Sequence, residues 1–299
     1  MSTIRSAALA SVCVLACAGG ALAEQATFRV KHHFRGSPDS TRLWWLVESN
    51  GNLVLDDTAK TVSLDAKPEP WKVGFDAIER VIFEQTTHKS GTAWGGLFIG
   101  GSAIDNKNVS DSWCYIEYRD GGALKPYVLL VPKESAAALQ DKMKAMLGAK
   151  VSAPVFSERP ESIKADTLAD LKSKQDFKSD SKNRPMPEAK PGKALVVVAN
   201  PLLDDPMSEG PLIRLFANGH VVAVNGWGTY AFANLDPGDY VLAAQYKDNV
   251  SALHVTLEAG KDYYFLEDMV KDGALLTRHT KELVMHQVSG ARYADWKTK

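Results

Sequence analysis

The chain has 299 residues, of which 45% are hydrophobic and 24% charged, and its formal net charge is -1. This is a globular composition, and the length suffices for two ordinary domains. The near balance of charge argues against the broad basic surface of a nucleic-acid-binding protein and against an acidic tail. We therefore expect no nucleic-acid partner.

Residues 1–23 have the pattern of a secretory signal peptide. Arg5 precedes an apolar run over residues 7–18, and small residues lie before Glu24. The apolar run is shorter than the roughly 20 residues that a transmembrane helix needs. The pattern predicts export, with a periplasmic location in a bacterium.

Two processing schemes for this signal remain open. The sequence Ala21-Leu22-Ala23 fits ordinary cleavage before Glu24, which would release a soluble protein. The sequence Val14-Leu15-Ala16-Cys17 instead resembles a bacterial lipobox, in which lipidation at Cys17 would anchor the protein in the cell envelope.

Cysteine usage gives one further expectation. Cys13 and Cys17 lie in the signal, so Cys114 is the one cysteine left after ordinary cleavage. It stands in the aromatic stretch "DSWCYIEYRD", which indicates a buried strand residue rather than a reactive thiol.

Residues 26–150 are expected to form an α+β domain. Apolar runs separated by turn signals predict six or seven strands, and the Asn50-Gly51 pair predicts a hairpin turn over residues 49–52, with a further turn at Asp56-Asp57. The stretch "KESAAALQDKMKAMLGAK" changes to a helical period, with Gly148 as a stop signal. The apolar face expected for this helix comprises Ala137, Leu139, Met143, Met146 and Leu147.

This order, with "GNLVLDDTAKTVSL", "VGFDAIERVIFE" and the terminal helix, resembles the pleckstrin-homology and GRAM-like domains. The resemblance is topological. It implies binding of lipids or peptides, although the fold carries many functions and no cluster of Lys and Arg marks a phosphate pocket here.

Residues 151–192 are expected to be a flexible linker. The segment holds five prolines and many charged residues, and it has too little apolar surface to build a core. Ile163, Leu168 and Leu171 predict at most one short helix within it.

Residues 193–290 are expected to form a β-sandwich, followed by a tail over residues 291–299. Eight short apolar segments, the last of them "KELVMHQV", are punctuated by Gly, Asn, Asp and Pro. In "LDPGDY", Pro237 presets φ and Gly238 accepts a positive φ, which predicts a structural turn between two strands.

The segments "KALVVVANP", "GTYAFANLDPGDYVLAAQ" and "LEAGKDYYFLED" resemble the bacterial family called domain of unknown function 2846 and, more distantly, prealbumin-like repeats. The resemblance covers about a third of the chain and departs at "LLDDPMSEGP". It implies an exported or lipid-anchored protein and no established activity.

Candidate metal ligands do not form a convincing set. His32 and His33 are neighbours on an expected strand and so point to opposite faces, and His279 and His286 lack a third ligand. Neither pair predicts a metal site.

Three carboxylates, those of Asp204, Asp205 and Glu209, share one loop but lack the order of a calcium-binding loop. The sequence therefore predicts no metal and no other cofactor.

Some hydrophobic groups are candidates for contact with a partner. The loop near Trp94-Phe98 contains Gly96 and Gly100 in a short apolar run, which predicts a connecting loop or, alternatively, one that touches a membrane or partner. For the pairs Trp44-Trp45 and Tyr263-Tyr264, strand alternation predicts one core and one outward residue each.

No nucleophile elbow, zinc-protease motif or P-loop occurs in the sequence, so no catalytic residue is assigned. The sequence favours an exported cell-envelope protein that acts as a non-catalytic binding or structural module, with an unknown envelope protein or ligand as partner. The alternative is a hydrolase or other enzyme with a site at the junction of the two domains.

Overall fold

The computed structural model describes residues 25–33, 48–66, 70–89, 108–201, 212–270 and 273–298. The fold is mainly β, as the sequence predicted. Four features predicted from the sequence lie outside the described residues: the expected signal segment with Cys17, the Trp44-Trp45 pair, the expected loop near Trp94-Phe98 and the acidic stretch over residues 204–209.

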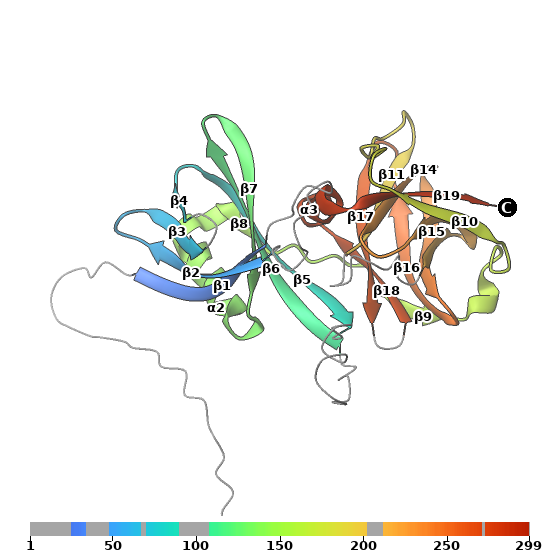
Figure 1. Cartoon of the computed structure of the whole chain (residues 1–299), viewed down its shortest axis with the longest axis horizontal. Helices are drawn as coiled ribbons and strands as arrows, with labels where there is room; N and C mark the ends of the chain where they lie inside the picture. The colour runs from blue at the N-terminus through green and yellow to red at the C-terminus, as the bar shows by residue number, and fades with distance from the viewer. Residues whose placement is uncertain are drawn as a thin grey trace, which may run out of the picture.

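The N-terminal unit, residues 25–152, consists of one eight-stranded sheet and a helix (Figure 1). Its strand order is β4-β3-β2-β1-β7-β6-β5-β8, and all neighbours are antiparallel except β5 and β8. The strands are β1 (Gln25–His33), β2 (Glu48–Asp56), β3 (Thr61–Ala66), β4 (Trp71–Gly74), β5 (Ile78–Lys89), β6 (Asn108–Asp120), β7 (Ala123–Val131) and β8 (Val151–Ser152).

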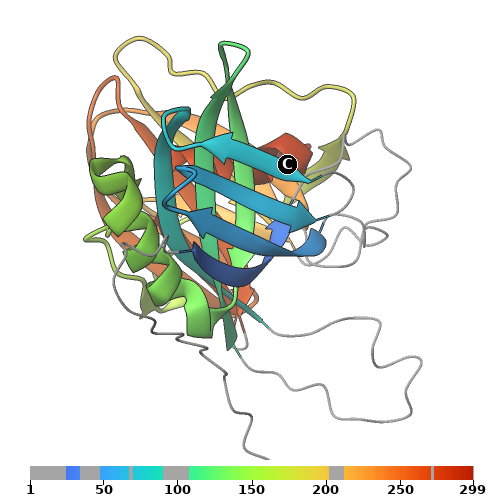
Figure 2. The ribbon, with the colours of Figure 1, turned by 90° about the vertical axis from the view of Figure 1, so that its left-hand side faces the viewer.

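Alternating apolar residues build the core of this unit. Leu53 and Leu55 of β2 and Val62 and Leu64 of β3 are fully or almost fully buried on one face of the sheet. The helix α2 (Lys133–Leu147), at the side of the sheet in Figure 2, adds Ala136, Leu139 and Met143 to the same core. Ala137, expected on that face, is exposed instead.

Two local expectations in this unit have different outcomes. The predicted turn over residues 49–52 is wrong, because these residues lie inside β2, where all four pair with β1 and Gly51 and Asn52 also pair with β3. Two neighbouring strands outweigh the turn preference of Asn50-Gly51. The turn at Asp56-Asp57 is confirmed: residues 57–60 link β2 to β3, and Lys60 has a φ of 51°. Gly148 ends α2 with a φ of 61°, as expected.

The C-terminal sandwich, residues 161–298, has a six-stranded and a five-stranded sheet. The six-stranded order is β10-β19-β14-β11-β17-β18, and the five-stranded order is β13-β12-β15-β16-β9. The elements are β9 (Glu161–Ile163), the 3-10 helix η3 (Ala165–Thr167), β10 (Gln175–Asp180), β11 (Ala194–Asn200), β12 (Ile213–Ala217), β13 (His220–Asn225), β14 (Thr229–Leu235), β15 (Gly238–Tyr246), β16 (Asn249–Leu257), β17 (Asp262–Val270), β18 (Gly273–His279), α3 (Lys281–Gly290) and β19 (Arg292–Thr298).

The core of the sandwich lies between its two sheets. Val196 and Phe265 of the six-stranded sheet share it with Leu215 and Leu242 of the five-stranded sheet. The Pro237-Gly238 turn joins β14 to β15, which belong to different sheets, so this turn carries the chain across the sandwich. Gly238 has a φ of 149°, which L side chains rarely adopt.

The expected flexible linker over residues 151–192 is wrong. Strand β9 pairs with β16, and β10 pairs with β19, so the segment supplies an edge strand to each sheet of the sandwich. Leu168 is buried in a small cluster with Phe216 and Val250. An edge strand gains its stability from backbone hydrogen bonds, and it therefore needs few apolar residues.

The end of the chain also differs from expectation. The segment "KELVMHQV", predicted as a strand, is the helix α3, which begins after the N-cap residue Thr280. Its buried residues Leu283, Val284 and Val288 follow helical spacing. The predicted tail over residues 291–299 contains β19, which pairs with β10 and β14.

The two units share a third core, which we call the junction core. Trp113 and Val128 of the N-terminal unit pack here against Leu195 and Tyr264 of the six-stranded sheet and against Val284 of α3. In Figure 1, α3 lies between the two units. The sheet of the N-terminal unit is therefore covered on one face by α2 and on the other by the sandwich.

Candidate functional site: a groove between the two units

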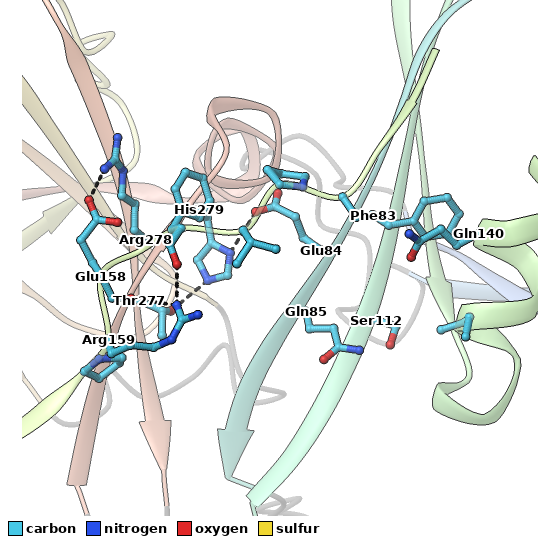
Figure 3. A pocket seen from close by; sticks show the side chains of 17 residues that line it. Phe83, Glu84, Gln85, Ser112, Gln140, Glu158, Arg159, Thr277, Arg278 and His279 are labelled. Carbon is cyan, nitrogen blue, oxygen red and sulfur yellow. Dashed lines mark hydrogen bonds and ion pairs between the residues drawn. The ribbon is translucent and has the colours of Figure 1, made fainter. Parts of the chain in front are cut away.

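A cavity of about 510 Å³ lies beside the junction core, and we call it the junction groove (Figure 3). Its walls come from Phe83–Gln85 of β5, Ser112 of β6, one side of α2, the connecting segment 153–160 and Thr277–His279 of β18. The volume lies in the range of small-ligand and peptide sites. Both units contribute to it, so neither forms the groove alone.

The groove runs along the edges of two strands. Successive side chains of a strand point to opposite faces, yet three consecutive residues of β5 and three of β18 line the groove. Such a pattern arises where a cavity follows the backbone edge of a strand. Strand β18 is the last strand of its sheet, and β8 covers β5 only at Val81 and Ile82.

A buried carboxylate joins the two units at the end of the groove. Glu84 Oε1 lies 3.2 Å from His279 Nδ1 and accepts the backbone N–H of Thr280 at 3.1 Å. Glu84 Oε2 accepts the hydroxyl of Thr280, the N-cap residue of α3. The negative charge thus lies at the positive end of the α3 dipole, where it is stabilised. Glu84 therefore fixes β5 to the start of α3.

The imidazole of His279 also contacts a hydroxyl. Thr277 Oγ1 lies 2.9 Å from His279 Nε2, and both residues are on the same face of β18. When Nδ1 carries the proton and donates it to Glu84, Nε2 accepts the hydrogen bond of Thr277. The groove thus contains a hydroxyl, an imidazole and a carboxylate in series.

Two arginines on the β18 side of the groove have different environments. Arg278 pairs with Glu158 and lies 4.9 Å from the ring centroid of Tyr263 and 5.1 Å from that of Phe156. The Nη1 group of Arg159 donates hydrogen bonds to the backbone oxygens of Phe156 and Glu158. Its charge has no acidic partner among the described residues, so Arg159 gives the groove an uncompensated positive charge.

The β6 wall of the groove holds an unsatisfied hydroxyl. Ser112 is 4% exposed, and its Oγ has no hydrogen-bond partner in the part of the chain that the structure describes. Gln85 on the paired position of β5 is exposed. A buried polar group without a partner costs about 1–3 kcal/mol, so Ser112 is a local energetic cost in the wall beside the groove.

A second cavity of about 390 Å³ lies between α3 and the sheet of the N-terminal unit. Arg80 bridges Glu117 at 2.8 Å and Glu282 at 2.7 Å there, and the hydrogen bond to Glu117 is the main cause that raises the pKa of Arg80. His286 lines this cavity and lies 2.8 Å from His33, measured between Nε2 and Nδ1. These contacts link the two units. Because the charges of Arg80, Glu117 and Glu282 are paired with one another, this cavity is a weaker candidate for a charged ligand.

Of the four histidines singled out from the sequence, His33, His279 and His286 lie at the junction, whereas His32 lies against the core of the N-terminal unit. His32 and His33 point to opposite faces, as expected: His32 stacks on Tyr127 with ring centroids 4.0 Å apart, and burial lowers the pKa of His32 to about 4. His33 faces His286, a residue 253 positions away. No local sequence spacing signals this contact.

Other expectations concern single residues. Cys114 is fully buried, as predicted, and burial raises the pKa of its thiol. Tyr263 lies in the sandwich core and Tyr264 in the junction core, so the outward member of this pair is covered by the other unit.

Sequence reasoning missed the two buried acids of β17. Glu267 and Asp268 are 0% and 3% exposed, and burial raises the pKa of each to about 8. Glu267 Oε2 accepts a hydrogen bond of 2.9 Å from Asn225 Nδ2. The "YYFLED" stretch carries the signal, since its acids continue a fully apolar strand run.

No family model matches this chain, and no curated protein matches it. Within the described ranges, no group of three or more His, Cys, Asp or Glu side chains is placed to hold a metal ion. No helix in these same ranges has the length and apolarity needed to cross a membrane.

Proposed function

We propose that the protein is an exported bacterial cell-envelope protein that acts by binding, and that the junction groove holds its partner. Export rests on the signal pattern of residues 1–23, and both processing schemes, release after Ala23 or lipidation at Cys17, stay part of the proposal. The resemblance to domain of unknown function 2846 agrees with an envelope location.

The observation that supports binding is the shared construction of the groove. The junction core buries Trp113 and Tyr264 and holds the units together, while β5 and β18 leave a cavity beside it. Ligand sites commonly occur where two folded units meet. The connecting segment 153–160, with Pro154 and Pro160, forms one more wall.

The test is partner capture from envelope extract with the full chain. Gln85→Trp places a large ring in the groove from an exposed position on β5, and Lys72→Trp makes the same change at an exposed position of β4, the far edge strand. We expect a partner retained by the native protein and by Lys72→Trp but lost from Gln85→Trp. Equal retention by both variants would contradict the assignment of the groove.

A second candidate function, a hydrolase, is favoured by one observation. The series Thr277, His279 and Glu84 has the order of a nucleophile, a general base and an orienting carboxylate, and it opens on the groove. The cap that Glu84 makes to α3 accounts for the same carboxylate without catalysis. We therefore place this function second.

The hydrolase is tested with a panel of p-nitrophenyl esters and Thr277→Val, which keeps the shape of the side chain and removes the hydroxyl. Turnover that is lost in Thr277→Val while the circular dichroism spectrum is unchanged would favour catalysis. Absence of turnover in the native chain, together with groove-dependent capture, would favour binding.

A further inference from the structure

We propose that the ligand of the junction groove is an extended peptide with a carboxylate. The peptide adds as a strand to the edge of β5 that no described strand covers beyond Ile82, and it places the carboxylate on Arg159. This inference rests on the proposed function, since it names the class of ligand for the same groove.

The first argument is the backbone along the groove. Strand β5 continues for seven residues beyond Ile82, the last position that β8 covers, and residues 83–85 line the cavity. An uncovered strand edge presents alternate N–H and C=O groups to one side. An extended peptide satisfies a row of such groups, whereas a compact ligand does not.

The connecting segment does not occupy this edge. It follows β8 directly, but Pro154 has no N–H to donate, and no backbone hydrogen bond joins residues 153–160 to β5 or β18 within the described part of the chain. In Figure 3 the segment crosses from β5 toward β18, with Gln85 and Ser112 on one side of the groove and Thr277 and Arg159 on the other.

The second argument is charge. Four ionisable side chains besides His279 line the groove: Glu84, Glu158, Arg159 and Arg278. Glu84 is bound by His279 and Thr280, and Glu158 pairs with Arg278. Arg159 donates only to backbone oxygens, so its remaining guanidinium N–H groups are available to a carboxylate.

The third argument is the β6 wall. Ser112, whose buried Oγ has no partner among the described residues, lies at the position paired with the exposed Gln85 of β5. The apolar side of the groove includes Phe83, Ala136 and Val155, and Val155 is 80% exposed. A strand-like peptide with alternating apolar and polar residues matches both surfaces.

The probe is a library of labelled ten-residue peptides that alternate Val and Glu at fixed positions with randomised residues between, measured by fluorescence anisotropy against the full chain. We expect saturable binding by a subset of the library. For the tightest member, Arg159→Gln is expected to weaken binding about tenfold, because a charge-assisted hydrogen bond is lost. Lys72→Gln removes an exposed cation on β4, at the opposite end of the eight-stranded sheet from β5, and is expected to leave binding unchanged.

Three forms of that peptide separate the contributions. N-methylation at alternate residues blocks strand addition and is expected to abolish binding. Glu→Gln peptides and C-terminally amidated peptides show whether the carboxylate is a side chain or the chain end, and loss with either one supports the proposal. Hydrogen exchange should slow in residues 83–87 of β5 on binding.

The proposal is overturned if no library member binds saturably, if N-methylated peptides bind equally well, or if Arg159→Gln has no effect on a bound peptide. If the peptide experiments fail while Gln85→Trp still abolishes partner capture, the peptide is rejected as the ligand and the groove is retained as the binding site. Capture that is insensitive to Gln85→Trp would reject the groove itself.

Discussion

Glu84 Oε1 on β5 lies 3.2 Å from His279 Nδ1 at the end of β18, and both side chains are about 95% buried. The pair joins residues 195 positions apart and belongs to both units. Because the same carboxylate binds the N-cap residue Thr280, it determines where α3 begins relative to β5.

Loss of this charge should destabilise the junction. Glu84→Gln keeps one acceptor oxygen but turns the other position into an amide donor facing Thr280, so we expect a loss of about 1–3 kcal/mol in the free energy of unfolding. Urea denaturation followed by Trp fluorescence measures it. The control is Glu79→Gln. Glu79 lies on β5, as Glu84 does, and forms an exposed ion pair with Arg119, so its loss should cost less than about 0.5 kcal/mol. Equal effects would show that Glu84 does not stabilise the junction.

The segment over residues 151–192 should be required by the sandwich. A fragment starting at residue 151 contains β9 and β10, while a fragment starting at residue 193 exposes the edges of β16 and β19. We expect the longer fragment to unfold cooperatively and the shorter one to be less stable or to aggregate. Urea unfolding with analytical ultracentrifugation compares them. Identical midpoints would restore the linker interpretation of this segment.

Burial of Glu267 predicts that stability depends on pH between about 4.5 and 8. The folded-state pKa of about 8 exceeds the ordinary value of 4.5, so the folded chain retains a proton that the unfolded chain loses between these values. The native protein should therefore lose stability as pH rises from about 4.5 to 8.

Glu267→Gln mimics the protonated form and keeps an oxygen for Asn225. Its stability should nearly equal that of the native chain near pH 4.5 and exceed it at pH 8 by about 4–5 kcal/mol. Chemical denaturation across this range tests the sign. A native chain that gains stability relative to the variant as pH rises would refute it.

His32 predicts the opposite behaviour on the acid side. Its folded-state pKa of about 4 lies below the ordinary 6.5, so stability should be lost as pH falls from 6.5 through 4. His32→Phe keeps an aromatic ring against Tyr127 and should reduce this loss, measured as the shift of the thermal midpoint between pH 6.5 and 4.5. An unchanged shift in the variant would assign the acid sensitivity to other groups.

Gly238 should tolerate no side chain without strain, because its φ of 149° is unfavourable for L residues, although an added Cβ would make only an ordinary contact of 3.9 Å with Tyr240 Cε2. We expect Gly238→Ala to cost about 1–3 kcal/mol. Asp236→Ala at an exposed neighbouring position is the control, and thermal unfolding of the two variants compares them. Similar losses in both would remove φ as the cause.

The sequence predictions were right where local interactions determine the structure and wrong where contacts between distant residues determine it. Strands such as Thr61–Ala66 and the helix over Lys133–Leu147 were predictable because their apolar periods and stop signals are local. The helix Lys281–Gly290 was read as a strand because its apolar run is short, and a short run does not distinguish the two periods.

The sequence predicted a site at the junction only as part of the alternative function, an enzyme, and it predicted none of the residues of the groove. Its residues come from five segments, and contacts such as Glu84 with His279 have no sequence signature. The edge strands β9 and β10 were missed because backbone pairing, rather than apolar side chains, holds them.

The central claim, that the junction groove binds the partner, is tested most directly by photo-cross-linking in the intact envelope. A benzophenone amino acid is placed at Gln85 in the groove or at Lys72 on β4, both exposed positions of the full chain. The account predicts a discrete adduct from position 85, with none from position 72, and reduced adduct formation when Arg159 is changed to Gln. Adducts from position 72 alone, or none from position 85 while the partner is still captured, would contradict it.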